Sequence, residues 1–316
     1  MKHILVTGSL AFDYIMDFPG AFSDHIMPDK IHQINLSFLV NTLKKERGGT
    51  AGNIAYNLSL LKINPAIFAA AGNDFGEYAS FLKQQGIDTS NIQIIKDKKT
   101  ASAFIMTDKV DNQITGFYPG AMTHSNEYSL KTLQQKPDFV IISPNDPKAI
   151  IKLADECRKL NIPFMIDIGM QLPSLTSDEI KNIVQKATIL IGNDYEIDLL
   201  KKKSSLSEEE LFKQVEILII TLGANGSQIT TKNETCAIPP AKPKEVLDPT
   251  GAGDAYRAGF MAGYIRGLDL KTCGQMGSVA ACYAIEKYGT QQHRFTIDAF
   301  QERYVQTFGD VLELEK

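Results

Sequence analysis

Apolar strands alternate with helices through the middle of this chain, and that alternation constrains the fold more than any other feature. Short apolar runs typical of buried strands recur at 66–71, 138–143, 163–168, 189–192 and 217–222. Helical segments lie between them, at 147–160, 178–187 and 208–214. Buried strands that alternate with helices indicate a mostly parallel sheet covered by helices on both faces. We therefore predict an α/β, Rossmann-like fold that begins with a short strand at 3–8.

Two segments interrupt this alternation. Residues 31–39 alternate polar and apolar side chains, as a half-buried strand does, and a second such piece lies at 100–107 and 114–118 around an Asp-Asn turn. Antiparallel strands inserted into an α/β chain predict a small sheet that stands off the main body. We place this small sheet at about 12–47 and 99–121, within a single domain of residues 1–316.

A glycine-rich loop at 248–254 opens a predicted helix and reads Asp-Pro-Thr-Gly-Ala-Gly-Asp. Such a loop exposes backbone N–H groups at the positive end of the helix dipole, where they can hold a phosphate. Gly251, Ala252 and Gly253 are therefore candidates for an anion hole. Asp254 could merely stabilise the helix start, but beside an anion hole it is also placed to take a proton. The Gly-Lys-Ser/Thr of a Walker loop is missing, so the cluster favours phosphoryl transfer with an aspartate base.

This loop resembles the C-terminal motif of the PfkB (ribokinase) family of carbohydrate and nucleoside kinases. Arg-Gly-Gly-Thr-Ala-Gly-Asn at 47–53 leads into another helix and resembles the N-terminal motif of the same family. The resemblance covers essentially the whole chain and implies a ribokinase-like kinase. ATP would be the phosphate donor, Mg²⁺ would bridge its phosphates, Asp254 would be the general base and the small sheet would be a lid over the substrate.

The resemblance also implies which residues bind the phosphate acceptor. Asp13, a few residues past the first strand, would bind substrate hydroxyls, although without the family it would be a solvated loop carboxylate. Gly48, Gly49 and Asn53 would contact the acceptor as well. Glycine lets the backbone pass close to a ligand, and an asparagine amide both donates and accepts hydrogen bonds.

Nucleotide and metal sites are implied in the second half of the chain. Asn193 and Glu196 resemble the family's Asn-x-x-Glu element, which orders Mg²⁺ through water; an Asx cap on the next helix is the simpler interpretation of Asn193. Asp248 and Thr250 would help bind a monovalent cation such as K⁺. The resemblance also implies ATP-binding residues. They are Asn193, a turn after a strand (Thr221, Gly223 and Gly226) and a helix face with small side chains (Gly277, Ser278 and Ala281). A plain turn is the alternative for the second group, and tight helix packing is the alternative for the third.

The acceptor is predicted from three segments that look most like the bacterial adenosine-kinase-like nucleoside kinases: 49–58, 35–40 and 288–293. The lid aromatics, Phe38 among them, are expected to sandwich a base, with core packing as the alternative. We therefore expect phosphorylation of the 5′-hydroxyl of a ribonucleoside, adenosine or another purine. A ribokinase- or fructokinase-like sugar kinase is the alternative. A catalytically dead, nucleotide-binding regulator would have no need of the Asp254 carboxylate.

Composition argues against several other classes. A formal net charge of −4 argues against a surface for nucleic acid polymers. The four cysteines are scattered, which suits reduced thiols better than a disulfide frame or a zinc site. Apolar runs are too short to span a bilayer. We expect a cytoplasmic protein, monomer or homodimer, whose partners are ATP and a small nucleoside or sugar.

Overall fold

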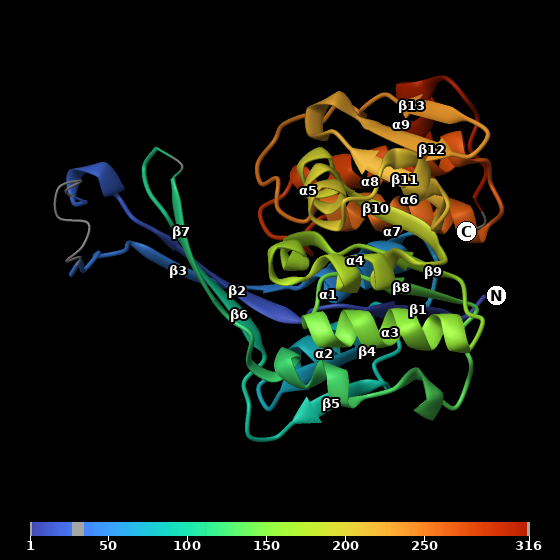
Figure 1. Ribbon diagram of the computed structural model, residues 1–316. Coiled ribbons are helices and arrows are strands. Elements are labelled where there is room, and N and C mark those ends of the chain that lie inside the picture. Colours follow the sequence, from blue (N-terminus) through green and yellow to red (C-terminus); the bar gives the residue numbers. More distant parts are fainter. Residues whose placement is uncertain (1, 27–34, 111, 315–316) are drawn as a thin grey trace.

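The computed structural model describes residues 2–26, 35–110 and 112–314, and it contains a large and a small sheet (Figure 1). The large sheet has nine strands in the order β13-β12-β11-β10-β9-β8-β1-β4-β5. Neighbours from β5 to β11 are parallel, and β12 and β13 add an antiparallel edge. The strands are β1 (Ile4–Thr7), β4 (Pro65–Gly72), β5 (Ile92–Ile95), β8 (Phe139–Ile142), β9 (Phe164–Ile166), β10 (Ala187–Asn193), β11 (Val215–Thr221), β12 (Ser227–Thr231) and β13 (Thr235–Ile238). The predicted α/β fold class is confirmed.

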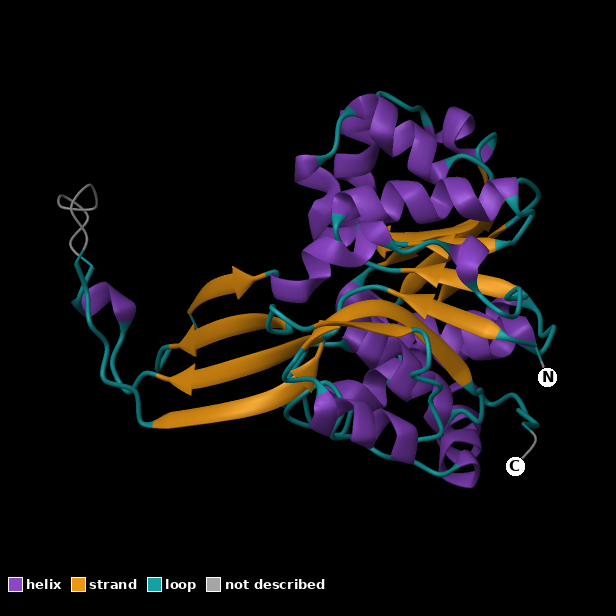
Figure 2. Ribbon diagram, turned by 90° about the horizontal axis from the view of Figure 1, so that it is seen from below, coloured by secondary structure: helices purple, strands orange, loops and turns teal. Residues whose placement is uncertain are grey.

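Helices cover both faces of this sheet (Figure 2). One layer consists of α1 (Thr50–Leu60), α2 (Gly76–Gln84), α7 (Ala252–Ile265), α8 (Leu270–Ile285) and α9 (Ile297–Phe308). The other consists of α3 (Pro147–Lys159), α4 (Ser177–Val184), α5 (Asp194–Ser204) and α6 (Glu208–Phe212). Short 3-10 turns are η1 (Phe22–Asp24), η3 (Gly120–Glu127), η4 (Leu130–Thr132), η5 (Gly169–Ser174) and η6 (Gly223–Asn225). Successive residues of a strand point to opposite faces of the sheet. On β1, Val6 therefore packs with the first helix layer and Leu5 with the second.

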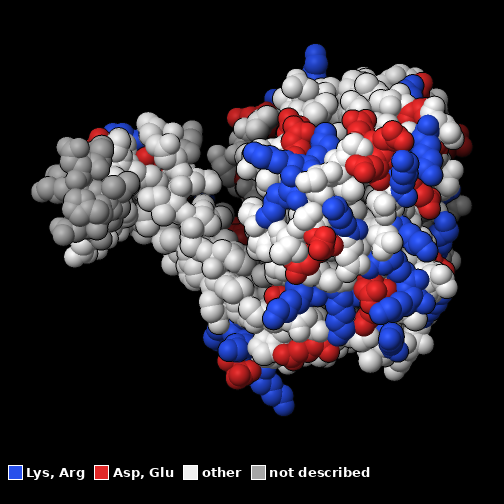
Figure 3. Space-filling model, in the orientation of Figure 1, with Lys and Arg blue, Asp and Glu red and all other residues white. Residues whose placement is uncertain are grey.

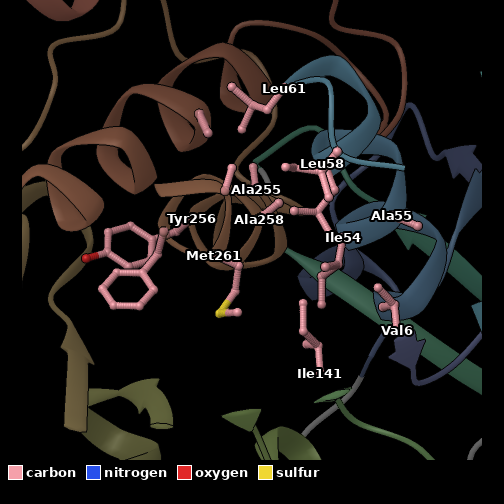
Figure 4. Packing of buried hydrophobic residues seen from close by; sticks show 14 of the residues in the cluster. Val6, Ile54, Ala55, Leu58, Leu61, Ile141, Ala255, Tyr256, Ala258 and Met261 are labelled. Atoms are coloured by element: carbon pink, nitrogen blue, oxygen red, sulfur yellow. The ribbon is translucent and has the colours of Figure 1, made fainter. Parts of the chain in front are cut away.

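Helices α1 and α7 pack side by side on the sheet (Figure 4). Ile54 and Leu58 of α1 lie against the small side chains of Ala255 and Ala258 of α7, all of them fully buried. Burial of an aliphatic side chain as large as leucine is worth about 1.5–3 kcal/mol. Both glycine-rich motifs form helix starts, so this packing brings the two motifs together.

The small sheet stands away from the large one (Figure 1). Its order is β3-β2-β6-β7, from β2 (Ala11–Asp17), β3 (Thr42–Gly48), β6 (Ala101–Thr107) and β7 (Gln113–Tyr118). The expectation of purely antiparallel strands was wrong, because β2 and β6 run parallel while the outer pairs are antiparallel.

The strand predicted at 31–39 is corrected by the structure. Positions 31–34 lie outside the described residues, and 35–39 are not in a strand. The strand is β3 instead, which pairs with the full length of β2 from Gly48 opposite Ala11 to Thr42 opposite Asp17. Among the described residues before Thr42, Asn41 N donates to Asp17 O at the end of β2, and 35–41 lie outside any strand.

On the face that Figure 3 shows, Lys and Arg side chains are interspersed with Asp and Glu over the main body, and the lid carries few charges. A surface of mixed sign does not concentrate a polyanion. Among the described helices, none is both long and apolar enough to cross a lipid bilayer.

Candidate active site

Residues of the two glycine-rich motifs meet where α1 and α7 begin. Asn53 Nδ2 donates a hydrogen bond of 2.9 Å to Asp254 Oδ2. Asp13, on β2, lies against Gly48, because a Cβ placed on that glycine would be 2.3 Å from Asp13 Oδ2. The Asp254 carboxylate is also close enough to Asp13 to raise the pKa of Asp13. The structure therefore gathers Asp13, Asn53 and Asp254 at the junction of the two sheets.

Gly49 occupies a position that only glycine fits. Its φ is +88°, and a Cβ there would lie 2.5 Å from Ser9 O and 2.6 Å from Ala11 N. Both of those neighbours are backbone atoms that cannot move aside. The chain can thus pass from β3 into α1 only with a glycine here, which fixes where α1 presents Asn53.

The start of α7 has the geometry of an anion-binding site. Gly251, with φ +80°, is the N-cap residue and provides no side-chain cap to the helix. The first N–H groups of a helix have no intrahelical acceptor, so the turn that contains Gly253 and Asp254 can present its amides to a phosphate. Thr290 packs behind this loop, since a Cβ on Gly251 would lie 3.0 Å from Thr290 Cγ2.

Burial sets the electrostatics of the two carboxylates. Burial raises the pKa of Asp254 to about 6, while Arg257 and the hydrogen bond from Asn53 oppose the shift. Burial also raises the pKa of Asp13 to about 6, and the carboxylates of Asp248, Asp254 and Glu46 add to that shift. A general base works best with a pKa near the working pH. Asp254 is therefore more basic than an exposed aspartate and is still ionised at neutral pH.

Asp167 and Arg257 form a buried ion pair that the sequence interpretation missed. Arg257 Nη2 lies 2.7 Å from Asp167 Oδ2, and the side chains are only 8% and 4% exposed. Burial raises the pKa of Asp167, against the opposing effect of Arg257. The signal in the sequence was an arginine alone within the apolar helix that follows Asp254. Arg257 of this pair lies about one helical turn after Asp254 on α7.

Asn193 and Glu196 form a capping box at the start of α5. Asn193 Oδ1 accepts from Glu196 N, and Glu196 Oε2 accepts from Asn193 N, both over 2.8 Å. The capping interpretation of Asn193 therefore describes its contacts. The box uses one carboxylate oxygen of Glu196, Oε2, and not the other. No three His, Cys, Asp or Glu side chains converge as a metal cage in the described ranges, and Mg²⁺ commonly keeps several waters.

Asp248 links the loop at which a monovalent cation was expected to the segment that follows α8. Its Oδ1 accepts from Thr250 N over 2.9 Å, and its Oδ2 accepts from Gly289 N over 3.0 Å. The backbone N–H of Asp248 also donates to Ile285 O at the end of α8. The carboxylate thus ties the anion-hole loop to the segment after α8.

The residues predicted to bind ATP lie in two places. Thr221 ends β11, Gly223 begins η6 and Gly226 ends that turn, with φ +88°. On α8, Ser278 Oγ accepts from Ala241 N over 2.7 Å, and both Ser278 and Ala281 are partly exposed. Gly277 is buried, and a Cβ there would lie 2.9 Å from Tyr256 O on α7. The helix-packing alternative therefore describes Gly277, which is not on an open wall.

Phe38 lies apart from the other predicted site residues. Its ring packs edge-on against Phe18 and Phe22, with centroids 4.8 and 5.3 Å away. Phe22 belongs to η1, the short blue coil at the end of the lid far from α1 and α7 in Figure 1. The packing alternative thus describes Phe38, and the structure corrects the expectation that it flanks the substrate.

Phe117 is the aromatic residue that shares a lid face with Asp13. Asp13 is opposite Ala103 on β6, and Ala103 is opposite Phe117 on β7. Residues in one cross-strand row point to the same face, and two strand spacings separate them by about 10 Å. Phe117 is 47% exposed. Phe104 is one residue out of that row and stacks on Tyr14 with centroids 5.0 Å apart, on the opposite face.

Known proteins resemble this chain over its whole length. The model of the pfkB family carbohydrate kinases matches residues 2–296. A nucleoside kinase of Methanocaldococcus jannaschii is 32% identical, with 96% of this chain and 97% of that protein covered. The structure of Burkholderia thailandensis nucleoside kinase in complex with inosine is similar at a TM-score of 0.88 and 34% identity, covering 98% and 99%. The same enzyme in complex with ADP-inosine matches at a TM-score of 0.87 and 35% identity, covering 99% and 98%.

Proposed function

This chain belongs to the pfkB family of carbohydrate kinases, which are phosphotransferases that act on hydroxyl groups, and we propose that its acceptor is a ribonucleoside. The proposed reaction moves the γ-phosphoryl group of ATP to the 5′-hydroxyl of a purine nucleoside. Two relatives that are 32% and 33% identical to this chain are nucleoside kinases. The bound inosine of the Burkholderia enzyme makes a purine the first candidate.

The row from Asp13 through Ala103 to Phe117 is the observation that carries this proposal. A carboxylate for sugar hydroxyls and an exposed aromatic ring lie on one face, about 10 Å apart. That spacing suits a ribose held at Asp13 with its base against Phe117. A free sugar has no group that would use the ring, so the row favours a nucleoside over a bare pentose.

In the proposed reaction, Asp254 removes the proton of the 5′-hydroxyl as the oxygen attacks the γ-phosphorus of ATP, and the bond from that phosphorus to the bridging oxygen breaks to release ADP. The backbone amides of Gly251, Ala252 and Gly253 at the start of α7 would stabilise the charge that develops on the transferred group, with the Ala252 N–H turning from Pro249 O, to which it donates here. The Arg257 guanidinium, which is paired with Asp167, lies close enough to lower the pKa of Asp254. Asn193 and Glu196 would hold Mg²⁺ through water, and the ion would supply neutralisation of the phosphate charge. Asp13 and Asn53 orient the ribose.

A substrate screen tests the proposal, with kcat/KM measured for inosine, adenosine, guanosine, uridine, ribose and fructose. Stacking on an aromatic side chain contributes about 1–3 kcal/mol per base, so a purine nucleoside should exceed ribose by roughly tenfold to a hundredfold. Phe117→Ala should lower nucleoside use by about tenfold and leave any ribose activity unchanged.

The matched control is Phe104→Ala, which truncates a similarly exposed ring (45%) on the opposite face. Phe104→Ala and Phe38→Ala, each as a single variant, should leave the ratio of nucleoside to ribose activity close to that of the wild type. If ribose or fructose exceeds every nucleoside, the acceptor is a sugar and the proposal is wrong. ATP binding without turnover of any acceptor would instead indicate a regulator.

We further propose a K⁺ site at Asp248 and the Thr250 carbonyl, behind the anion hole. The support is that the Asp248 carboxylate bridges this loop to Gly289. A cation there would hold in place the loop that carries the Gly251 to Gly253 amides. Replacing K⁺ by tetramethylammonium should therefore lower kcat, measured at constant ionic strength. Equal kcat in the two cations would contradict the site.

A further inference from the structure

We propose that Gln291 is a positioning residue: anchored by Tyr78 and the Gly48 carbonyl, it holds the Asn53 amide with its NH₂ group toward Asp254. The inference rests on the proposed function, because it assigns a role in keeping the base of that reaction ready. The loop at 288–293 contributed only a resemblance to the sequence interpretation. In the structure its Gln291 is buried among the residues of the site.

The chain of hydrogen bonds starts at an atom whose role is fixed. The backbone carbonyl of Gly48 can only accept, so the Tyr78 hydroxyl donates to it over 2.9 Å. Burial raises the pKa of Tyr78, so the hydroxyl keeps its proton. A hydroxyl has a single hydrogen, and toward Gln291 the Tyr78 oxygen can therefore only accept. This requires the NH₂ group of Gln291 to face Tyr78, as it does.

The same NH₂ group determines how Asn53 is oriented. Gln291 Nε2 donates its other hydrogen to Asn53 Oδ1 over 2.8 Å. Thr290 Oγ1 lies 2.8 Å from that oxygen too, but it also lies 3.0 Å from Arg47 O and has one hydrogen for both. With Oδ1 facing the loop, the opposite end of the amide, Nδ2, faces Asp254 Oδ2. The direction of every bond thus follows from the Gly48 carbonyl.

A fixed amide favours the ionised base. With its NH₂ group held toward Asp254, Asn53 offers a donor, which suits a carboxylate and not a protonated carboxyl. A free amide could turn and accept a hydrogen bond from protonated Asp254, which would stabilise that form. The other titratable groups around Asp254 are Asp13 on β2, Tyr78 on α2, Asp167 after β9 and Arg257 on α7. The chain of hydrogen bonds acts in addition to them.

The test is the pH profile of kcat/KM for inosine between pH 5 and 9. The wild type should lose activity below about pH 6, as Asp254 and Asp13 take up protons. Gln291→Met should move the acidic limb of the kcat/KM profile to higher pH by about 0.5–1 pH unit. The double variant Thr290→Val, Gln291→Met should move it further. Activity should therefore fall more at pH 6 than at pH 8. Loss of packing alone would lower activity equally at both values.

The matched control is Gln292→Met, the same change at an exposed neighbour whose side chain donates to Glu46. Its profile should follow that of the wild type. If Gln291→Met does not fold, Tyr78→Phe removes one oxygen from the same chain of hydrogen bonds and should shift the limb in the same direction. An unshifted limb in folded Gln291→Met or Tyr78→Phe overturns the inference. A wild type that phosphorylates no nucleoside overturns the proposed function instead.

Discussion

Asp254→Asn should lower kcat by about 10²–10⁴-fold while ATP binding and the fold remain close to those of the wild type. The amide matches the carboxylate in shape and can still accept the hydrogen bond from Asn53 Nδ2, which now spans 2.9 Å. It cannot accept the proton of the attacking hydroxyl. Initial rates with the best nucleoside give kcat, and calorimetric titration with ADP reports on the nucleotide site.

Thermal stability separates lost chemistry from lost structure in this variant. Because burial raises the pKa of Asp254 to about 6, the folded state binds this proton more tightly than the unfolded chain does. That contribution to stability is present at low pH and is lost as pH rises through about 6. Asparagine never ionises, so Asp254→Asn should melt at the same temperature as the wild type or higher at pH 8. Near-normal kcat in a folded variant would remove Asp254 from the role of base.

The fold class and the two glycine-rich motifs were predictable because their signals are local. A buried parallel strand is apolar over its whole length. The loop at 248–254 contains the proline and glycines that are typical of a turn. The lid strand β3 was missed because Thr-Leu-Lys-Lys-Glu-Arg-Gly shows no clear alternation. Its strand conformation depends on pairing with β2, and such pairing between distant segments leaves little trace in the sequence of either one.

The candidate site was only partly predictable, for a related reason. Thr290, Gln291 and Gln292 form one polar run, yet Gln291 is buried against Asn53 and Gln292 is exposed. Composition gives no means to rank the lid aromatics either. The register of β2, β6 and β7 places Phe117 on the face of Asp13 and Phe104 on the other, and register follows from the assembled sheet.

Asp13→Ala should lower kcat/KM for a ribonucleoside by about 10²–10⁴-fold and remove most of the preference for ribose over deoxyribose. A hydrogen bond between a carboxylate and a hydroxyl contributes about 1.5–3 kcal/mol, and under the proposed function Asp13 binds two hydroxyls of the ribose ring. For the wild type, 2′-deoxyinosine should be poorer than inosine by roughly tenfold or more, since a missing hydroxyl leaves a buried polar group unpaired.

The ratio of inosine to 2′-deoxyinosine activity is the decisive measurement, because a variant that is merely less stable loses activity toward both substrates equally. In Asp13→Ala that ratio should fall toward one, leaving only the share that Asn53 contributes. Asp17→Ala is the matched control: Asp17 lies four residues along β2 on the same face, beside Thr42 at the lid end of the strand. It should change neither kcat/KM nor the ratio by more than about twofold, as for most surface substitutions. An unchanged ratio in Asp13→Ala would mean that the ribose hydroxyls are bound elsewhere.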